Sequence, residues 1–392
     1  MRGANGIRTT GGGRWRRPAR MLLVAVGLLI LGQLVPANAS AAPASGLRYV
    51  GLLPSPLAGP KSVGQDCNIA QIDPAGRRLY VLCTNFGFPK AYLTEYDISK
   101  RIPVPIRSVP ALPSADIPGS ISPYDTAFDG SRHRLLLLAT NNTGASVVHV
   151  IDLASLKQTG SWDLSRVAPG FAALGMTYAP RDGRVYLVGD LSGSPALASG
   201  VLGSKVIGPA TSVVALDART GKLAWIRPVP QCQQVLLTLG TGALIARSSF
   251  RPALYFFCST GGSLPPLSPY PGEAGVVRLT ITRTTSENKA LHFPVVFFPI
   301  SGSYTNGNQT GIAAFDPGSD RLFAQSLADS NPGAWVFDGR MSAWVGFIAA
   351  PHSDDFYLGI DCASGHYYMG GDASTSKAWV LVSDSRVTPV PQ

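Results

Sequence analysis

The chain has 392 residues, 45% hydrophobic and 14% charged, so it is long enough for one large or two ordinary domains and too apolar for extended disorder. Its 43 Gly and 32 Pro occur singly at turn-like positions, which excludes a mainly helical chain and favours many short strands. Six of the 33 Lys and Arg precede residue 21, and the remaining 27 face 23 Asp and Glu without a basic cluster interleaved with aromatics, which predicts no nucleic-acid partner.

Residues 1–41 have the pattern of a secretory signal peptide. Six Arg precede an apolar run at 21–31, and small-residue A-x-A sites follow at 37–39 and 39–41. The run is short for a transmembrane span, so an uncleaved anchor is the lesser alternative, and no later segment is long and apolar enough to cross a bilayer. Arg outnumbers Lys 25 to 8, as in GC-rich bacteria. We therefore expect an exported bacterial protein, secreted or in the cell envelope, whose mature part is 42–392.

A short pattern recurs along the mature chain: a strand, a polar residue, a tight turn, and an apolar strand beginning six residues after the polar residue. The clearest copy is "IDPAGRRLYV" at 72–81. The polar or small residue that marks each copy is Asp73, Asp129, Ala179, Ser248, Asp316 and Asp361.

A second apolar strand follows each marker, usually ending in Asp and a turn, and a further strand such as "TGSWDL" or "AWIRPV" can follow. Four short strands per unit are typical of a β-propeller, in which blades bury both faces of each sheet around a common axis. The sequence predicts a single all-β propeller over 42–392 with four-stranded blades. Six blades are favoured and seven are the alternative, because a degenerate unit could lie in 179–248. The strand predicted at 46–54 could complete the last blade and close the ring.

These repeats resemble the YVTN-type repeats of secreted propellers, which are WD40-like in architecture. The resemblance rests on "LYVLCTN" (79–85) and "LLLLATNN" (135–142), and "SVVALDARTGKLAW" (212–225) is similar to the repeat of quinoprotein amine dehydrogenase-like propellers. It covers nearly all of 45–392 and implies the propeller fold, while propellers as a class have many functions. A single copy has the Thr-Gly-x-x-x-Trp form, so quinone binding is not carried over.

Five cysteines are available for disulfides in an exported protein. Cys67 and Cys83 lie eight positions either side of the first turn and are predicted to face each other across two antiparallel strands. Cys232 and Cys258 are the natural second pair, which leaves Cys362 as the odd thiol, its state unknown. No CxxC occurs, so neither a redox dithiol nor a zinc site is predicted.

The candidate site lies where loops lead into the innermost strands, because such loops line one mouth of a propeller channel. "PHSDDFY" (351–357) breaks the repeat, and "GQDCN" and "SPYDT" precede the first two innermost strands. Carboxylates and an imidazole converging there could bind a divalent ion or a hydroxylated or cationic ligand. The candidate ligand-binding residues are Asp66, Asp125, His352, Asp354 and Asp355.

The function expected from the sequence is a binding scaffold for an extracellular or envelope ligand, because no Walker loop, GxSxG or HExxH stands in a suitable context. The partner is a protein, peptide or glycan, and the protein is expected to be a monomer. The alternative is an extracellular enzyme at the channel mouth: a metal- or quinone-dependent oxidoreductase, a lyase or a hydrolase. No catalytic residue is assigned, no metal site is assigned, and no cofactor is evident beyond an unsupported divalent cation or quinone.

Overall fold

The structure is a computed structural model of the whole chain. It describes residues 47–58, 69–73, 75–83, 92–111, 125–140, 145–191, 210–229, 232, 234–235, 245–248, 250–259, 274–281, 295–299, 312–316, 319–326, 333–349, 356–361, 366–370 and 378–383. The chain divides into two compact units, Met1–Ser40 and Ala41–Gln392. All described residues belong to the second unit, so the predicted signal peptide lies outside the described residues and stays a prediction.

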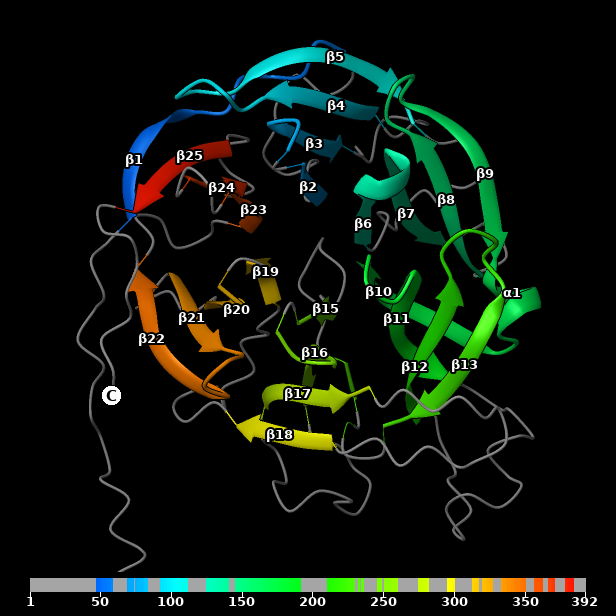
Figure 1. Cartoon of the computed structure of the whole chain (residues 1–392). Helices are drawn as coiled ribbons and strands as arrows, with labels where there is room; N and C mark the ends of the chain where they lie inside the picture. The colour runs from blue at the N-terminus through cyan, green and yellow to red at the C-terminus, as the bar shows by residue number, and fades with distance from the viewer. Residues whose placement is uncertain are drawn as a thin grey trace, which may run out of the picture. The chain divides into compact units, whose positions relative to one another are not determined.

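Five sheets of the second unit are each built from strands that are consecutive in sequence (Figure 1). The first contains β2 (Ile69–Asp73), β3 (Arg78–Cys83), β4 (Tyr92–Asp97) and β5 (Val104–Pro110). The second contains β6 (Asp125–Asp129), β7 (Arg134–Thr140), β8 (Ser146–Asp152) and β9 (Lys157–Asp163). The third contains β10 (Phe171–Ala179), β11 (Arg184–Leu191), β12 (Ala210–Asp217) and β13 (Leu223–Pro228). The 3-10 turn η2 (Gly130–Arg132) joins β6 to β7, and the short helix α1 (Leu164–Val167) joins β9 to β10.

The fourth and fifth sheets continue this order along the chain. The fourth contains β14 (Gln234–Val235), β15 (Ile245–Arg247), β16 (Ala253–Ser259), β17 (Ala274–Thr280) and β18 (Val295–Pro299). The fifth contains β19 (Ile312–Asp316), β20 (Arg321–Ser326), β21 (Gly333–Asp338) and β22 (Ala343–Ala349). All neighbouring strands in these sheets are antiparallel.

The remaining sheet is composite, because it joins the two ends of the unit. Strands β23 (Phe356–Asp361), β24 (His366–Gly370) and β25 (Ala378–Ser383) pair in order, and β1 (Leu47–Leu52) adds to the outer edge of β25. The predicted closing role of the strand at 46–54 is confirmed. Pairing the first strand with the last replaces two open sheet edges by hydrogen bonds and fixes the ends of the unit to each other.

The predicted fold class needs correction, because the sheets are not a set of six or seven alike four-stranded blades. Five blades are contiguous, and one further sheet is assembled from both ends of the unit. The fourth sheet has five strands, since β14 and β15 both pair with β16 along its inner edge. Among the described residues of the interval 179–248 there is no additional sheet, so the seven-blade alternative is also wrong. What holds is the class, an all-β propeller.

The burial pattern along each strand shows which strands are packed between neighbouring sheets. The middle strands β3 and β8 are buried on both faces, whereas the outer strands β5 and β9 alternate between exposed and partly buried positions. A strand buried on both sides must lie between two other sheets, and an alternating one has one face in water. Apolar clusters accordingly join adjacent sheets, for example Leu136 and Val148 of the second sheet with Leu187 of the third. No helix in the described part of the chain is long and apolar enough to cross a membrane.

The repeat markers end the innermost strands, other Asp residues end the third strands, and both kinds lead into tight turns. Asp73 Oδ1 accepts the N–H groups of Ala75 and Gly76 at 3.0 Å, and Asp217 Oδ1 likewise accepts those of Arg219 and Thr220. These contacts form Asx turns, which agrees with the tight turn that the repeat predicts. Four residues after the Asp, the backbone takes a left-handed conformation, with φ of 54° in the first such turn. The left-handed residues of these hairpins are Arg77, His133, Leu156, Gly183, Gly221, Asp320 and Ser342.

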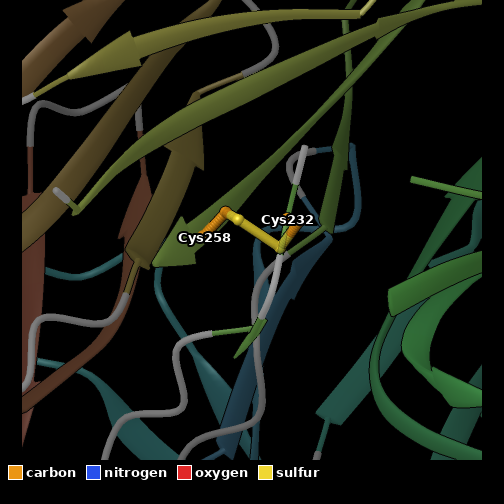
Figure 2. Close-up of a disulfide and its surroundings, with 2 residues drawn as sticks. All are labelled: Cys232 and Cys258. Atoms are coloured by element: carbon orange, nitrogen blue, oxygen red, sulfur yellow. A yellow bond between two sulfur atoms is a disulfide. The ribbon is translucent and has the colours of Figure 1, made fainter. Parts of the chain in front are cut away.

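Disulfide bonding agrees with the pairing predicted for the fourth sheet. Cys232 precedes β14 and bonds to Cys258 of β16, with 5.5 Å between their Cα atoms (Figure 2). Both residues are buried in the apolar cluster between the third and fourth sheets. Cys83 is also disulfide-bonded. Its predicted partner Cys67 lies outside the described residues, so that pairing stays a prediction, as does the odd thiol at Cys362.

Candidate functional site

Asp125 alone of the five predicted mouth residues can be placed. It is the first residue of the innermost strand β6, at the end of the strand where the preceding loop arrives. The Asp125 side chain is buried, and its place in a channel mouth stays a prediction. Asp66, His352, Asp354 and Asp355 lie outside the described residues, so their convergence with Asp125 stays a prediction.

The Asp125 carboxylate links two neighbouring innermost strands. Its Oδ1 accepts the N–H of Thr126 at 2.7 Å and its Oδ2 accepts the N–H of Met176 in β10 at 2.8 Å. On the other side of β6, the Gln71 side chain of β2 donates to the Thr126 carbonyl at 2.9 Å. Burial raises the pKa of Asp125 to about 8, against the lowering effect of the two backbone donors. The carboxyl therefore has a structural role between blades.

Asp125 is predicted to make the stability of the protein fall as the pH rises. In the unfolded chain the carboxyl loses its proton near pH 4, and in the folded chain near pH 8. The folded chain therefore holds an extra proton in that window, so its advantage is complete below pH 4 and is lost on rising through pH 8. The free energy of unfolding should fall by up to about 1.4 kcal/mol per pH unit. The free energy of unfolding, measured with urea at several pH values from 5 to 8, should fall less steeply with pH in Asp125→Asn than in the wild type. An equally steep fall in the variant would contradict the assignment.

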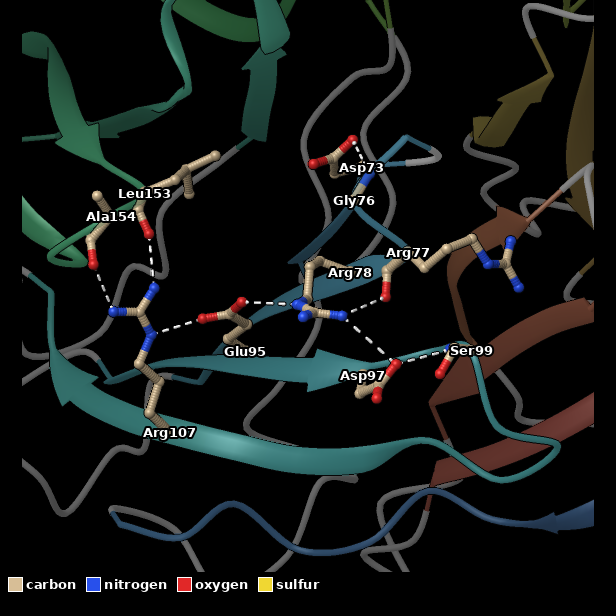
Figure 3. Close-up of polar contacts among 10 residues, drawn as sticks. All are labelled: Asp73, Gly76, Arg77, Arg78, Glu95, Asp97, Ser99, Arg107, Leu153 and Ala154. Atoms are coloured by element: carbon tan, nitrogen blue, oxygen red, sulfur yellow. Dashed lines mark hydrogen bonds and ion pairs between the residues drawn. The ribbon is translucent and has the colours of Figure 1, made fainter.

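At the opposite ends of the innermost strands, the hairpins of the first two sheets share an ion-pair network (Figure 3). Glu95 of β4 is buried, and its two oxygens pair with Arg78 Nε at 3.0 Å and Arg107 Nε at 2.5 Å. Arg107 also donates to the carbonyls of Leu153 and Ala154 in the second sheet, both at 2.6 Å. A carboxylate between two guanidinium groups is fully compensated, and the second guanidinium fastens one blade to the next.

Both residues of the Arg pair after Asp73 have partners within the first sheet. Arg77 donates to the Ile98 carbonyl at 2.9 Å, and Arg78 pairs with Glu95 and Asp97. The stretch therefore has an architectural role in holding the first hairpins together. Sequence reasoning missed the part played by Glu95, although a glutamate inside an apolar strand in a chain with three Glu is a visible signal.

Glu95→Ala is predicted to lower the free energy of unfolding by about 2 kcal/mol. Two guanidinium groups would lose their shared buried anion, and the cost is reduced because both Arg side chains are about one-third exposed to water. Arg166→Ala provides the control, since its partner pair with Asp163 is exposed and should contribute less than about 0.5 kcal/mol. Equal losses in the two variants, measured by urea unfolding, would contradict the role given to Glu95.

The described residues offer little for metal or catalytic chemistry. No group of three or more His, Cys, Asp or Glu that could hold a metal ion occurs among them. The carboxylates of the hairpins are occupied in turns and ion pairs, as at Asp129, which pairs with Arg132 at 3.0 Å and Arg134 at 2.8 Å. The hairpin ends of the sheets therefore form a rigid frame, held by turns and ion pairs.

Comparison with known proteins identifies the class as a β-propeller. No protein-family model matches the chain, and no curated protein matches it. Among solved structures, it is similar to Kuenenia stuttgartiensis hydrazine synthase, with a TM-score of 0.50 and 11% identity over 81% of this chain and 84% of that one. It is also similar to the Cps50 (Swd1) β-propeller domain of Myceliophteria thermophila, with a TM-score of 0.50 and 10% identity over 86% of this chain and all of that one. At this identity the likeness shows the fold alone.

Proposed function

We propose that the chain is an exported bacterial β-propeller that acts as a binding scaffold for a protein, peptide or glycan outside the cytoplasm. The observation that carries the proposal is the buried Cys232–Cys258 bridge inside a propeller frame. Buried structural disulfides are formed and kept in oxidising compartments, and a propeller frame commonly presents loops to a partner. The leader at 1–41 and its cleavage before residue 42 belong to this proposal.

The blades are proposed to be of the YVTN and quinoprotein-like type, at the level of the blade motif. The "DARTGKLAW" segment gives each motif residue a physical role. Thr220 Oγ1 donates to Asp217 at 2.8 Å, and Gly221 supplies the left-handed turn with φ of 69°. Trp225 then packs 5.8 Å from the ring of Tyr186. These roles close a hairpin and cover a blade face, so they support a structural use of the motif.

The proposed binding site is the mouth at the starting ends of the innermost strands. The strand boundaries support loops of different length there, because β11 ends at Leu191 and β12 begins at Ala210, while β16 ends at Ser259 and β17 begins at Ala274. These second-to-third connections lie at the same ends of the sheets as Asp125. Longer connections on one face enlarge the surface available to a partner.

Export is tested by fractionating a bacterial host that expresses the full chain with a C-terminal tag. The wild type should appear outside the cytoplasm with an N-terminus near residue 42. Leu28→Asp combined with Leu29→Asp interrupts the apolar run and should keep the chain inside with its leader intact. A wild-type chain that remains in the cytoplasm uncleaved would overturn the proposed compartment.

The mouth is tested by a glycan and peptide array with His352→Ala and Asp355→Ala. Both variants should lose the ligand signal while keeping the wild-type melting temperature. Unchanged binding in both would end the assignment of this site. A rise in melting temperature on adding Ca²⁺ or a quinone would instead favour an enzyme that uses the same mouth.

A further inference from the structure

The hairpin turns at the far ends of the innermost strands form a second surface, here called the turn face. It contains the turns that follow the first and third strands of each contiguous sheet, which lie at one end because the strands alternate in direction. In the described turns, nine Lys and Arg side chains are exposed, coming from five sheets in succession. They are Lys100, Arg101, Arg132, Lys157, Arg181, Arg219, Lys222, Arg251 and Arg340.

Carboxylates of the turn face cancel only part of this charge at the surface. Asp73, Asp129 and Asp338 are buried beneath their turns, where they accept backbone N–H groups or pair with Arg. Asp217 is exposed and Asp97, Asp152 and Asp182 are partly exposed, and each is engaged by groups of its own turn or by Arg. The nine exposed cations therefore outnumber the four exposed or partly exposed carboxylates of the described turns, so the turn face has an excess of positive charge.

Large apolar side chains project from the same turns. Phe250 is 51% exposed and Met341 is 64% exposed, in hairpins of the fourth and fifth sheets. The Arg340 guanidinium lies 3.6 Å from the centre of the Phe250 ring, so cation and aromatic ring form one exposed unit. Ile102 and Leu223 are 40% and 42% exposed in hairpins of the first and third sheets. Cations and single apolar side chains thus alternate along the face.

Contacts between blades hold these turns in fixed relation to one another. Arg251 donates to the Arg340 carbonyl and to Ser342 Oγ, and Ser248 Oγ donates to Asp320 at 2.8 Å, which fastens the fourth sheet to the fifth. Arg247 pairs with Asp182 at 2.9 Å, which fastens the fourth sheet to the third. A surface fixed before binding loses little conformational entropy when it docks.

We propose that the turn face docks on the surface of an anionic phospholipid bilayer. Cations spread over five sheets match a broad charged plane better than a single groove, and each Lys or Arg near such a surface contributes attraction. The separate apolar side chains among the cations can insert between lipid headgroups and become buried there. A soluble polyanion offers no such apolar region. The inference goes beyond the proposed scaffold function because it concerns the end of the strands opposite the mouth. Bound in this way, the ring would present its mouth away from the membrane.

The experiment measures sedimentation of residues 41–392, the unit that contains all described strands and their core, with vesicles of phosphatidylglycerol and phosphatidylcholine. Binding is expected at 30 to 50 mM salt, is expected to weaken steeply at higher salt, and is expected to be absent with phosphatidylcholine alone. The combined variant Lys100→Ser, Arg101→Ser, Arg219→Ser, Lys222→Ser should lower the partition coefficient about a hundredfold. Phe250→Ser with Met341→Ser should lower it about tenfold.

Matched controls come from other surfaces of the same unit. Arg166→Ser removes an exposed cation from α1, at the mouth end, and should leave the vesicle affinity unchanged within about twofold. Arg219→Ser, which removes one cation from the turn face, should lower the vesicle affinity by more than about twofold. Leu57→Ser with Ile106→Ser removes apolar side chains that are 61% and 43% exposed along β5, away from the turns, and should also leave the vesicle affinity unchanged. Circular dichroism confirms that each variant is folded.

Two outcomes with vesicles overturn the inference: no binding to phosphatidylglycerol vesicles at low salt, or equal losses of binding in the turn-face variants and their controls. A third is binding to a soluble sulfated glycan, unaffected by the Phe250 and Met341 changes, without binding to vesicles. The last outcome would assign the face to an acidic polymer. Export and mouth binding are measured separately, so failure with vesicles leaves the proposed scaffold function standing.

Discussion

Gly189→Ala is expected to lower the free energy of unfolding by about 3 kcal/mol or more, although it adds one methyl group to a central strand. Gly189 lies in β11, opposite Ala173 of β10, where the register of the pair shifts. A Cβ at this position would lie 2.0 Å from the Ala172 carbonyl oxygen and 2.9 Å from the Ala173 Cα. Both obstacles are backbone atoms of a hydrogen-bonded strand, so relief requires moving the innermost strand of the third sheet.

The control for this prediction is Gly160→Ala in β9. A Cβ at Gly160 meets nothing within 4 Å, so the same substitution should change stability by less than about 1 kcal/mol and can be favourable by restricting the unfolded chain. Urea unfolding followed by tryptophan fluorescence measures both. Similar stabilities for the two variants would show that the bulge between β10 and β11 yields easily, and would contradict the close approach described for Gly189.

The sequence could predict the propeller class, but not the number of blades, because each blade carries its own local signals. The Asp at the end of an innermost strand accepts N–H groups two and three residues later, as Asp73 does, so the turn is defined within five residues. The apolar run that follows forms a strand buried on both faces, as in β3. A local rule repeated along the chain can be recognised from one copy.

The irregular fourth sheet shows where this local rule fails. Ser248 replaces the usual Asp and accepts the N–H groups of Phe250 and Arg251 at 3.3 and 3.1 Å. Pro252 occupies the position that takes a left-handed backbone in other hairpins, which the proline ring forbids. Both residues are visible in the sequence, but the splitting of the inner edge into β14 and β15 depends on pairing with β16 and is not a local property.

The turn face could not be predicted, because its members are scattered along the chain. Lys100, Arg219 and Arg340 are more than 100 residues apart in sequence, and each looks like an isolated surface cation. Only the ring brings successive hairpins to one end of the sheets. The same reason hid the link from Arg107 to Leu153, which crosses between blades. Of the predicted mouth, one member is described: Asp125 joins neighbouring innermost strands, and the mouth itself stays a prediction.

Replacing Cys232 and Cys258 together by Ala is expected to lower the free energy of unfolding by about 3 to 4 kcal/mol. The bridge closes a loop with a sequence separation of 26 residues, and opening it returns that loop entropy to the unfolded chain. Alanine at both positions avoids leaving a hydroxyl or a single thiol in the apolar cluster between the third and fourth sheets. The bridge also anchors β14, which pairs with β16 over two residues and has little other support.

Treatment with a reductant distinguishes the stability contribution of the Cys232–Cys258 bridge from that of the bridge at Cys83. Dithiothreitol should destabilise the wild-type protein by more than it destabilises the double variant, because the variant retains only the bridge that includes Cys83. The difference between the two losses is the contribution of Cys232–Cys258, provided the two bridges act independently in separate sheets. A double variant within about 1 kcal/mol of the wild type in urea, without reductant, would mean that packing of β16 holds the fourth sheet by itself. A large loss would instead make an oxidising compartment a requirement for this fold, which ties the stability of the blade directly to the proposed export of the chain.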